Sequence, residues 1–381
     1  MKGLAVKHPR WLLALAVLLA GVVAVPVAGA APPKPKPPKP ARVVDCVGAT
    51  TVQGVRSVAL PQRPSTDTGE FTGMVVDPRN ERRIWLYTVK TLFVTEDAGC
   101  TWQIVYEVAP PVGSVYPEVL ISLTPGAHLG TGRSAVMVTR TALTMATVHY
   151  STDGRTDWQK ATGLPNSGWV GSVAFSPLDP KLAYLTHTPY GTYFPRTYES
   201  QDGGKSWTAV EAPESMATAQ ALLLHPSPRK KTDLWAHTSF FVVGSGGVRY
   251  PPFQLTRSVD GGRTWAAVGP TNIGLMAVTA TKTGTRVLAL DNGRSMLHRS
   301  DDDGKTFTEL ATPELGTPQM LVGRGADDVF LTSQPGKAMK VYRLTGGSKW
   351  VEYAAGEHSF LTATAKSLIW RRAEFLQSRS L

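Results

Sequence analysis

Short hydrophobic runs, separated by turn-forming residues, recur along the chain from about residue 70 onward. In the first such stretch, four runs rich in β-branched and aromatic residues span Phe71–Asp77, Arg83–Thr88, Thr91–Thr95 and Trp102–Val108. Runs of this kind, bounded by Pro, Gly and Asn, are typical of β-strands. The stretch therefore predicts four consecutive strands joined by short turns.

The same scheme returns further along the chain. Val170–Ser176, Leu182–Thr186 and Tyr198–Ser200 predict three strands, and a fourth strand begins at Trp207. No long amphipathic helix is indicated after the N-terminal segment. The 36 glycines and 29 prolines among 381 residues fit many short strands and many turns. The pattern predicts an all-β protein.

A short motif separates the third and fourth strands of these units, with the pattern Ser/Thr-x-Asp-x-Gly-x-Ser/Thr-aromatic. Its copies, from the most complete to the most degraded, are Ser200–Trp207, Ser258–Trp265, Ser300–Phe307, Thr95–Trp102, Ser151–Trp158 and Leu344–Trp350, the last without its Asp. The closing aromatic residues are spaced roughly 40 to 60 residues apart, which is the length of one four-stranded repeat unit.

Each position of the motif has a structural explanation. An Asp can accept hydrogen bonds from the backbone of its own turn, a Gly adopts backbone angles that other residues resist, and the aromatic ring buries a large area against the hairpin. We therefore interpret these residues as structural rather than catalytic: Asp97, Asp153, Asp202, Asp260, Asp302, Trp102, Trp207 and Trp265.

The motif resembles the Asp box, or BNR repeat, of sialidases, xyloglucanases, sortilin-type receptors and photosystem II assembly factors. A second pattern, a strand followed by Asp-Pro, Ser-Pro or His-Pro and a turn, occurs at Met74–Asn80, Val173–Pro180 and Leu222–Pro228. It is more similar to the last three groups than to true sialidases. The resemblance extends from about residue 43 to the C-terminus and implies a single β-propeller of four-stranded blades.

The number of blades depends on how the two ends of the chain meet. Six repeats end near residue 355, and three further strands are predicted at Ser359–Ala365, Leu368–Ala373 and Phe375–Arg379. The missing fourth strand could come from Val43–Leu60 at the other end of the chain, which would close the ring and leave no free edge. We expect seven blades, with six as the alternative.

The N-terminal segment has the pattern of a secretory signal peptide over residues 1–30. Basic residues precede the apolar run Trp11–Val25, and the small residues Ala28–Ala30 follow it. Residues 31–42 form a Pro/Lys-rich linker, and residues 43–381 form the propeller. The protein is therefore expected to be secreted or held in the cell envelope. An uncleaved signal would instead leave it anchored to the membrane by its N-terminus.

Charge and cysteine content narrow the choice of partners. Seven of the eleven net positive charges come from the first 42 residues, which contain no Asp or Glu. The remainder lacks a concentrated Lys/Arg stripe, which argues against a nucleic-acid partner. The two cysteines, Cys46 and Cys100, either form a disulfide, which export would permit, or remain buried thiols. No Cys/His cluster indicates zinc, and we expect a monomer without metal or cofactor.

Two classes of glycoside hydrolase can be tested on individual residues. Sialidases carry a Phe/Tyr-Arg-Ile-Pro motif whose Arg binds the substrate carboxylate bidentately, but Gln62–Pro64 lacks its spacing and Tyr193–Arg196 has the wrong order. Xyloglucanases place paired acids, as glycoside hydrolysis requires, between two propellers, and this chain has the length of one. Acids without a distinctive spacing, better explained as solvated surface residues, are Asp77, Glu118, Glu199, Asp233, Asp291 and Glu352.

Two long loops, residues 187–196 and 239–253, connect the second and third strands of neighbouring units and are rich in aromatic residues. In propellers such loops lie on the face opposite the Asp-box turns, where ligands usually bind. The residues expected to bind are Tyr190, Tyr193, Phe194, Arg196, Arg249 and Tyr250, although these side chains could equally pack the loops onto the fold. The favoured function is a non-catalytic module that binds a glycan or an envelope or extracellular protein. A secreted glycoside hydrolase, sialidase-like or xyloglucanase-like, is the alternative.

Overall fold

The computed structural model describes residues 46–380 with short gaps, and all of them belong to the unit Val44–Leu381. The gaps are residues 47, 54, 78–79, 109–117, 130–131, 142–144, 191–194, 212–218, 241, 245–246, 250–253, 282, 292–295, 313–316, 325–327, 335–338, 347, 357–358, 364–366 and 373–374. The predicted signal peptide (1–30) and linker (31–42) lie outside the described residues.

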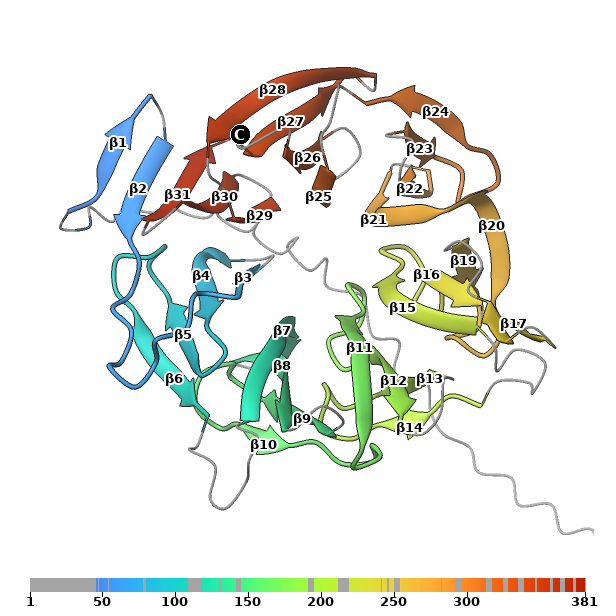
Figure 1. Ribbon diagram of the computed structural model, residues 1–381, viewed down its shortest axis with the longest axis horizontal. Coiled ribbons are helices and arrows are strands. Elements are labelled where there is room, and N and C mark those ends of the chain that lie inside the picture. The colour runs from blue at the N-terminus through green and yellow to red at the C-terminus, as the bar shows by residue number, and fades with distance from the viewer. Residues whose placement is uncertain are drawn as a thin grey trace, which may run out of the picture. The chain divides into compact units, whose positions relative to one another are not determined.

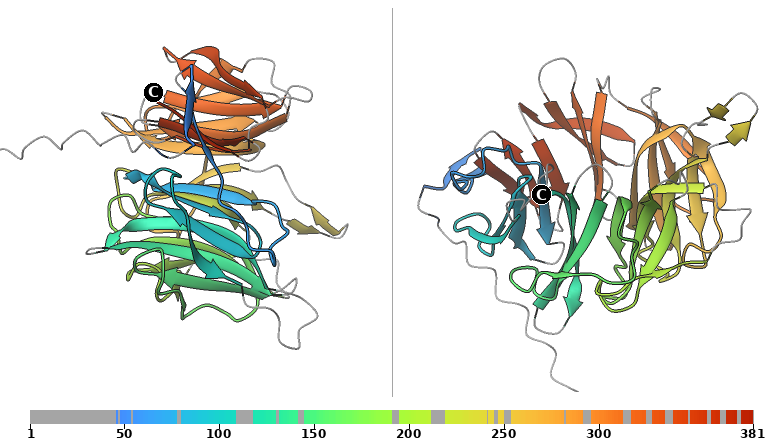
Figure 2. Two further views of the ribbon diagram at one scale, coloured as in Figure 1. Left: turned by 90° about the vertical axis from the view of Figure 1, so that its left-hand side faces the viewer. Right: turned by 60° about the horizontal axis from the view of Figure 1, so that its bottom comes forward.

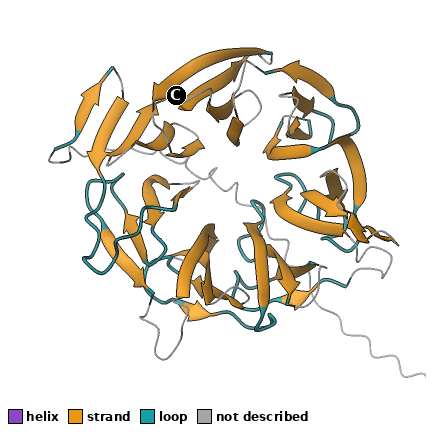
Figure 3. Cartoon of the chain, in the orientation of Figure 1, coloured by secondary structure: helices purple, strands orange, loops and turns teal. Residues whose placement is uncertain are grey.

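The described residues form strands, turns and loops, without a helix (Figure 3). Accordingly, this part of the chain contains no helix with the length and hydrophobicity needed to cross a membrane. The prediction of an all-β protein is confirmed for these residues.

Four-stranded antiparallel sheets follow one another along the chain (Figure 1). The first contains β3 (Gly73–Asp77), β4 (Asn80–Tyr87), β5 (Thr91–Thr95) and β6 (Gln103–Glu107). The second contains β7 (Glu118–Leu129), β8 (Gly132–Thr141), β9 (Met145–Ser151) and β10 (Gln159–Lys160). The third contains β11 (Gly168–Phe175), β12 (Ala183–Pro189), β13 (Arg196–Ser200) and β14 (Thr208–Ala209). A parallel bridge between Gly168 and Met145 joins the second and third sheets.

Three further sheets repeat this arrangement. The fourth contains β15 (Ala219–Pro226), β16 (Leu234–Phe240), β19 (Gln254–Ser258) and β20 (Ala266–Thr271). The fifth contains β21 (Ile273–Ala280), β22 (Thr285–Asp291), β23 (Met296–Ser300) and β24 (Thr308–Ala311). The sixth contains β25 (Thr317–Arg324), β26 (Asp328–Gln334), β27 (Met339–Thr345) and β28 (Lys349–Gly356).

The last sheet combines the two ends of the described chain. β29 (Ser359–Ala363), β30 (Ser367–Arg372) and β31 (Phe375–Ser380) follow one another, and β2 (Val55–Ala59) pairs antiparallel with β31. β1 (Thr50–Val52) adds an outer fifth strand. The strand expected from Val43–Leu60 is therefore present and paired with the C-terminal strand, as the count of strands required.

The sheets pack face to face, and their hydrophobic clusters draw on consecutive sheets. Val136 and Val138 of β8, for example, pack with Ala183 and Leu185 of β12 and with Trp207. Central strands such as β5 and β22 are buried along their whole length because sheets cover both of their faces. Outer strands such as β6 and β24 are mainly exposed.

The first strands of the sheets contact one another in chain order. β3 contacts β7, the contacts continue through β11, β15, β21 and β25 to β29, and β29 contacts β3. In Figure 1 these strands lie nearest the centre of the unit, and the outer strands lie furthest from it. The side views in Figure 2 show the strands of each sheet running across the thickness of the unit.

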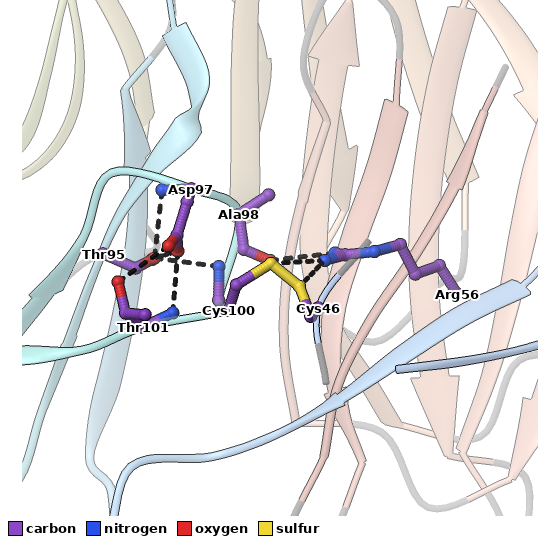
Figure 4. Close-up of a disulfide and its surroundings, with 8 residues drawn as sticks. Cys46, Arg56, Thr95, Asp97, Ala98, Cys100 and Thr101 are labelled. Carbon is purple, nitrogen blue, oxygen red and sulfur yellow. Dashed lines mark hydrogen bonds between the residues drawn. A yellow bond between two sulfur atoms is a disulfide. The ribbon is translucent and has the colours of Figure 1, made fainter. Parts of the chain in front are cut away.

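A disulfide between Cys46 and Cys100, with Cα atoms 5.0 Å apart, fastens the N-terminal segment to the turn between β5 and β6 (Figure 4). Arg56 of β2 reinforces this attachment, because its guanidinium donates a hydrogen bond of 2.9 Å to the carbonyl oxygen of Ala98 in the same turn. Of the two alternatives for the cysteines, the disulfide is the one observed.

The expected loop 239–253 is partly a β-hairpin. β17 (Val242–Gly244) pairs with β18 (Gly247–Arg249) and forms a separate two-stranded sheet. The hairpin projects away from the four-stranded sheet that carries it (Figure 2). The sequence does not predict this hairpin, because glycines interrupt the alternation of polar and apolar residues that marks a strand.

Candidate functional site

The Ser/Thr-x-Asp turns form the same hydrogen-bond network in five sheets. In the third sheet, the carboxylate of Asp202 accepts hydrogen bonds from Ser200 Oγ at 2.8 Å and from the Ser206 backbone N–H at 3.0 Å. Figure 4 shows the corresponding contacts of Asp97 with Thr95 and Thr101. The carboxylates with this network are Asp97, Asp153, Asp202, Asp260 and Asp302.

These hydrogen bonds also control ionisation. Partial burial alone would raise the pKa of Asp153, but donors from Thr156, Arg155 and Ser151 outweigh it and lower the pKa to about 2. Hydrogen bonds from Thr306 and Ser300 likewise hold the pKa of Asp302 below its usual range. Carboxylates that are ionised and occupied by their own turns have a structural role.

The glycine and aromatic positions explain how each turn meets the preceding sheet. Gly204 has a φ of +94°, and a Cβ there would lie 2.4 Å from Val136 Cγ2 of the second sheet. The indole N–H of Trp207, which is 3% exposed, donates to the Gly204 carbonyl at 3.1 Å. Trp265 makes the same contact with Gly262, whereas the ring of Trp102 is partly buried against the core of the first sheet.

Three of the acids expected at the surface are buried, which corrects the sequence prediction. Asp77 is 0% exposed, Asp233 1% and Asp291 5%. Asp233 is held by Arg257 through contacts of 2.8 and 2.7 Å, and Asp291 accepts a hydrogen bond of 3.0 Å from Asn272. Burial is tolerated because local donors replace the water that each carboxylate loses.

Two of the remaining acids, Glu352 and Glu199, contact polar side chains of their own sheets. Glu352 contacts Lys340 at 2.8 Å, and Glu199 accepts a hydrogen bond of 2.6 Å from Gln201. Each of these two acids contacts a nearby side chain, and the two acids lie far apart in the sequence. A glycoside hydrolase of the usual type requires two carboxyl groups facing one another across the scissile bond.

Glu118 belongs to a cluster of polar side chains on the first and second sheets. Its Oε1 lies 3.7 Å from His149 Nε2, which lies 3.0 Å from Thr139 Oγ1, and Thr139 donates to Glu118. Hydrogen bonding to His149 is the main cause of the lowered pKa of Glu118. Burial and the charge of Glu118 raise the pKa of Tyr106 to about 12. Glu118 is therefore ionised at neutral pH and unsuited to act as a proton donor.

The structure places only part of the predicted binding loops. Tyr193, Phe194 and Tyr250 lie outside the described residues, and Arg249 belongs to β18 without a described side chain. Tyr190 is 62% exposed at the end of β12. Arg196 is exposed on β13, directly opposite His187 of β12 in the strand register.

His187 is the most unusual side chain of this region. It is 1% exposed, packs edge-on against Tyr198 with ring centroids 5.9 Å apart, and neither ring nitrogen has a hydrogen-bond partner among the described residues. Burial lowers its pKa, so the ring is neutral at pH 7. Gly168 lies close to this strand, because a Cβ at that position would lie 2.2 Å from Thr188 O and 2.7 Å from His187 Cε1.

His187 is one of the residues that line a cavity of about 330 Å³ between the second and third sheets. Aliphatic side chains form much of its wall, including Val148 and Val170, and Thr147, Asn166 and Lys160 add polar groups. The segment after β10 that forms one side is pinned to the third sheet, because Trp207 N–H donates to Thr162 O at 3.0 Å. One side of the His187 cavity is therefore formed by anchored backbone, and the cavity is partly open to solvent.

Trp169 is a second residue that the sequence did not single out. It is 46% exposed on β11, where it pairs with Thr188, next to the pair formed by Gly168 and Pro189. Tyr190 follows immediately, and its N–H donates to Ser167 O. Trp169 lies just before the predicted strand that begins at Val170, so an aromatic residue at a strand start was the available signal.

Comparison with known proteins supports the fold. No known protein family has a sequence profile that matches this chain. A xyloglucanase from Paenibacillus sp. is 26% identical over 221 residues, covering 56% of this chain and 20% of the xyloglucanase. The chain thus spans about a fifth of the length of this relative.

Among solved structures, YCF48 bound to D1 peptide has a TM-score of 0.57 and 19% identity, covering 87% of this chain and 99% of YCF48. An ancestral GH74 enzyme has a TM-score of 0.55 and 16% identity, covering 85% of this chain and 49% of the enzyme. Virginiamycin B lyase from Staphylococcus aureus has a TM-score of 0.53 and 14% identity, covering 86% of this chain and 99% of the lyase. At these identities the likeness shows the fold alone: this chain is a β-propeller.

Proposed function

We propose that this chain is an exported, monomeric, non-catalytic binding module, and that its ligand is a glycan or an envelope or extracellular protein. The observation that carries the proposal is the pair of exposed aromatic rings, Trp169 and Tyr190, at the end of the third sheet that also holds the His187 cavity. Exposed aromatic faces are favourable contacts for sugar rings and for apolar side chains of proteins.

The scaffold for this module is an Asp-box propeller of seven blades. Five turns with one hydrogen-bond network support the Asp-box assignment. The contacts of the first strands, which run through seven sheets and return from β29 to β3, support seven blades rather than six. Pairing of β2 with β31 would close the ring and protect the edge of the last blade.

Location outside the cytoplasm is part of the proposal. The disulfide Cys46–Cys100 is the kind of bond that persists in oxidising compartments, and residues 1–30 have the pattern of a signal peptide. Intact-mass measurement of the exported protein should give a chain that begins at Ala31. Retention of the full chain in the membrane fraction would instead favour an uncleaved anchor.

A protein ligand gains support from the solved structures. The neighbour YCF48 was solved with a D1 peptide, so a propeller of similar fold accommodates a peptide. Arg196, which is exposed on β13 opposite His187 in the strand register, adds a donor suited to carboxylate groups. A glycan remains the other ligand class, because the same aromatic rings can stack on sugars.

A secreted glycoside hydrolase is the second candidate, and the likeness to the Paenibacillus xyloglucanase is the observation that favours it. Against it stand the carboxylates themselves, since Asp233 is bound by Arg257 and Glu118 by His149 and Thr139. Fluorogenic glycosides distinguish the two functions. Release of the fluorophore by the purified protein, together with its loss when a single acid is substituted, would establish the hydrolase.

The binding function is tested by probing glycan and peptide arrays with the mature protein. Trp169→Ala and Tyr190→Ala should each remove the signals that the wild type gives, and Phe375→Ala serves as the matched control because Phe375 is 48% exposed on a different sheet. Tyr193→Ala combined with Tyr250→Ala extends the test to the predicted loops. Signals unchanged by all of these substitutions would overturn the proposal.

A further inference from the structure

The His187 cavity has chemistry that the exposed aromatic rings do not share. It combines a buried imidazole, one lysine and neutral polar groups with aliphatic walls. Leaving the imidazole without a hydrogen bond in a protein interior is unfavourable, because its nitrogens lose the hydrogen bonds that they make with water. A buried imidazole without a hydrogen-bond partner at this position is explained if a ligand supplies that partner.

The charge at the wall of the cavity is positive. Lys160 lines it, Arg196 lies across from His187 on the neighbouring strand, and none of the lining residues is an Asp or Glu. No described residue forms an ion pair with Lys160 or Arg196. The charge of Arg196 reaches this region, since it opposes the rise that burial causes in the pKa of Tyr198, the ring packed on His187.

The size of the cavity limits what can enter. About 330 Å³ is at the lower end of the range of about 300 to 1,000 Å³ for small-molecule sites. The walls contributed by Val148, Leu164 and Val170 suit an aliphatic group. A cavity of this volume suits a small molecule or one terminal residue of a longer chain.

We propose that the His187 cavity binds an aliphatic carboxylate, with the carboxylate held by Lys160 and His187 and the aliphatic part packed against Val148 and Val170. A carboxylate is the anion that pairs with the lysine and accepts a hydrogen bond from the imidazole N–H. The group has two sources, a free short-chain carboxylic acid or the C-terminal residue of a peptide. Where the ligand is a peptide, the inference rests on the proposed binding function and defines one of its anchors.

Calorimetric titration of the full mature protein with matched pairs of ligands tests the inference. Isovalerate and N-acetyl-leucine carry the carboxylate, and isovaleramide and N-acetyl-leucinamide replace it by a neutral amide of the same shape. Both carboxylates should bind at least about tenfold more tightly than their amides, as expected when a charge-assisted hydrogen bond is lost. Tighter binding of N-acetyl-leucine than of isovalerate identifies the peptide source, and the reverse identifies the free acid. Equal affinity of acid and amide, or no binding of either acid, overturns the inference.

Substitutions locate the binding in the cavity. Lys160→Met should weaken carboxylate binding about tenfold or more without disturbing the fold, because Lys160 is exposed on its outer side. Lys349→Met is the matched control, since Lys349 is an exposed lysine of the sixth sheet. Equal binding by the wild type and Lys160→Met would place the carboxylate elsewhere.

The two proposals fail separately. Carboxylate binding that survives in a protein silent on glycan and peptide arrays removes the proposed function and leaves the cavity assignment standing. Array signals that depend on Trp169, in a protein that binds neither carboxylate, remove the cavity assignment alone.

Discussion

Replacing both cysteines of the Cys46–Cys100 disulfide by serine measures how strongly the N-terminal segment stabilises the fold. The bond spans 54 residues of sequence and attaches the segment that supplies β2 to the first sheet. In the chain-entropy description, a cross-link of this span stabilises the folded state by about 4 kcal/mol at 25 °C, because it restricts the unfolded chain. An unfolding entropy of about 0.6 kcal/mol per kelvin, expected for the roughly 275 described residues, converts this into a fall in Tm of about 7 °C.

Differential scanning calorimetry of the wild type and of the Cys46→Ser/Cys100→Ser variant gives this difference directly. Wild-type protein treated with a reducing agent is the control and should melt with the variant. Hydrogen exchange adds a local measurement, since loss of the bond should lower amide protection first in Val55–Ala59 of β2, which pairs with the C-terminal strand. Identical Tm values for the oxidised wild type and the variant would refute the idea that this attachment stabilises the ends of the chain.

Two further predictions concern charged groups. Hydrogen bonds in its turn hold the pKa of Asp302 below its ordinary value of 3.8. The stability that the ionised carboxylate contributes is therefore fully present above that value and is lost as the pH falls from there through the lower pKa of the folded protein. In scanning fluorimetry from about pH 5 to about pH 2, the wild type should therefore lose Tm more steeply than Asp302→Asn, and parallel curves would contradict the role of the turn. Arg257→Met leaves the Asp233 carboxylate, 2% exposed, without its counterion and should lower the free energy of unfolding in urea by about 3 to 5 kcal/mol. Lys340→Met, which breaks the more exposed contact with Glu352, should lower it by less than about 1 kcal/mol, and equal effects of the two substitutions would show that burial of the pair is unimportant.

The turns and the order of strands were predictable because their signals are local. The partners of Asp202, Ser200 and Ser206, lie within four residues of it, so the motif carries its own explanation. The N-terminal strand could also be anticipated, since three strands at the C-terminus lacked a fourth. The additional strand β1 and the register of β2 against β31 were beyond the sequence.

Burial of individual polar residues was not predictable in the same way. Asp233 is buried because the register of β16 and β19 brings Arg257 to it, and sequence spacing does not encode that register. His187 and Trp169 face opposite environments near a register shift between Val170 and Ser172. Irregularities of this kind redirect side chains locally. Strand alternation alone therefore did not predict that His187 is buried and Trp169 is exposed.

The central claim, that this propeller binds its ligand without cleaving it and uses the exposed aromatic rings to do so, is tested most directly by calorimetry. The measurement is a titration of the strongest array ligand into the wild type and into Trp169→Ala, followed by recovery of the ligand. The account predicts intact ligand and an affinity at least about tenfold lower for the variant, as for the loss of a central aromatic contact. Equal affinities, or recovery of a cleaved glycan, would contradict it.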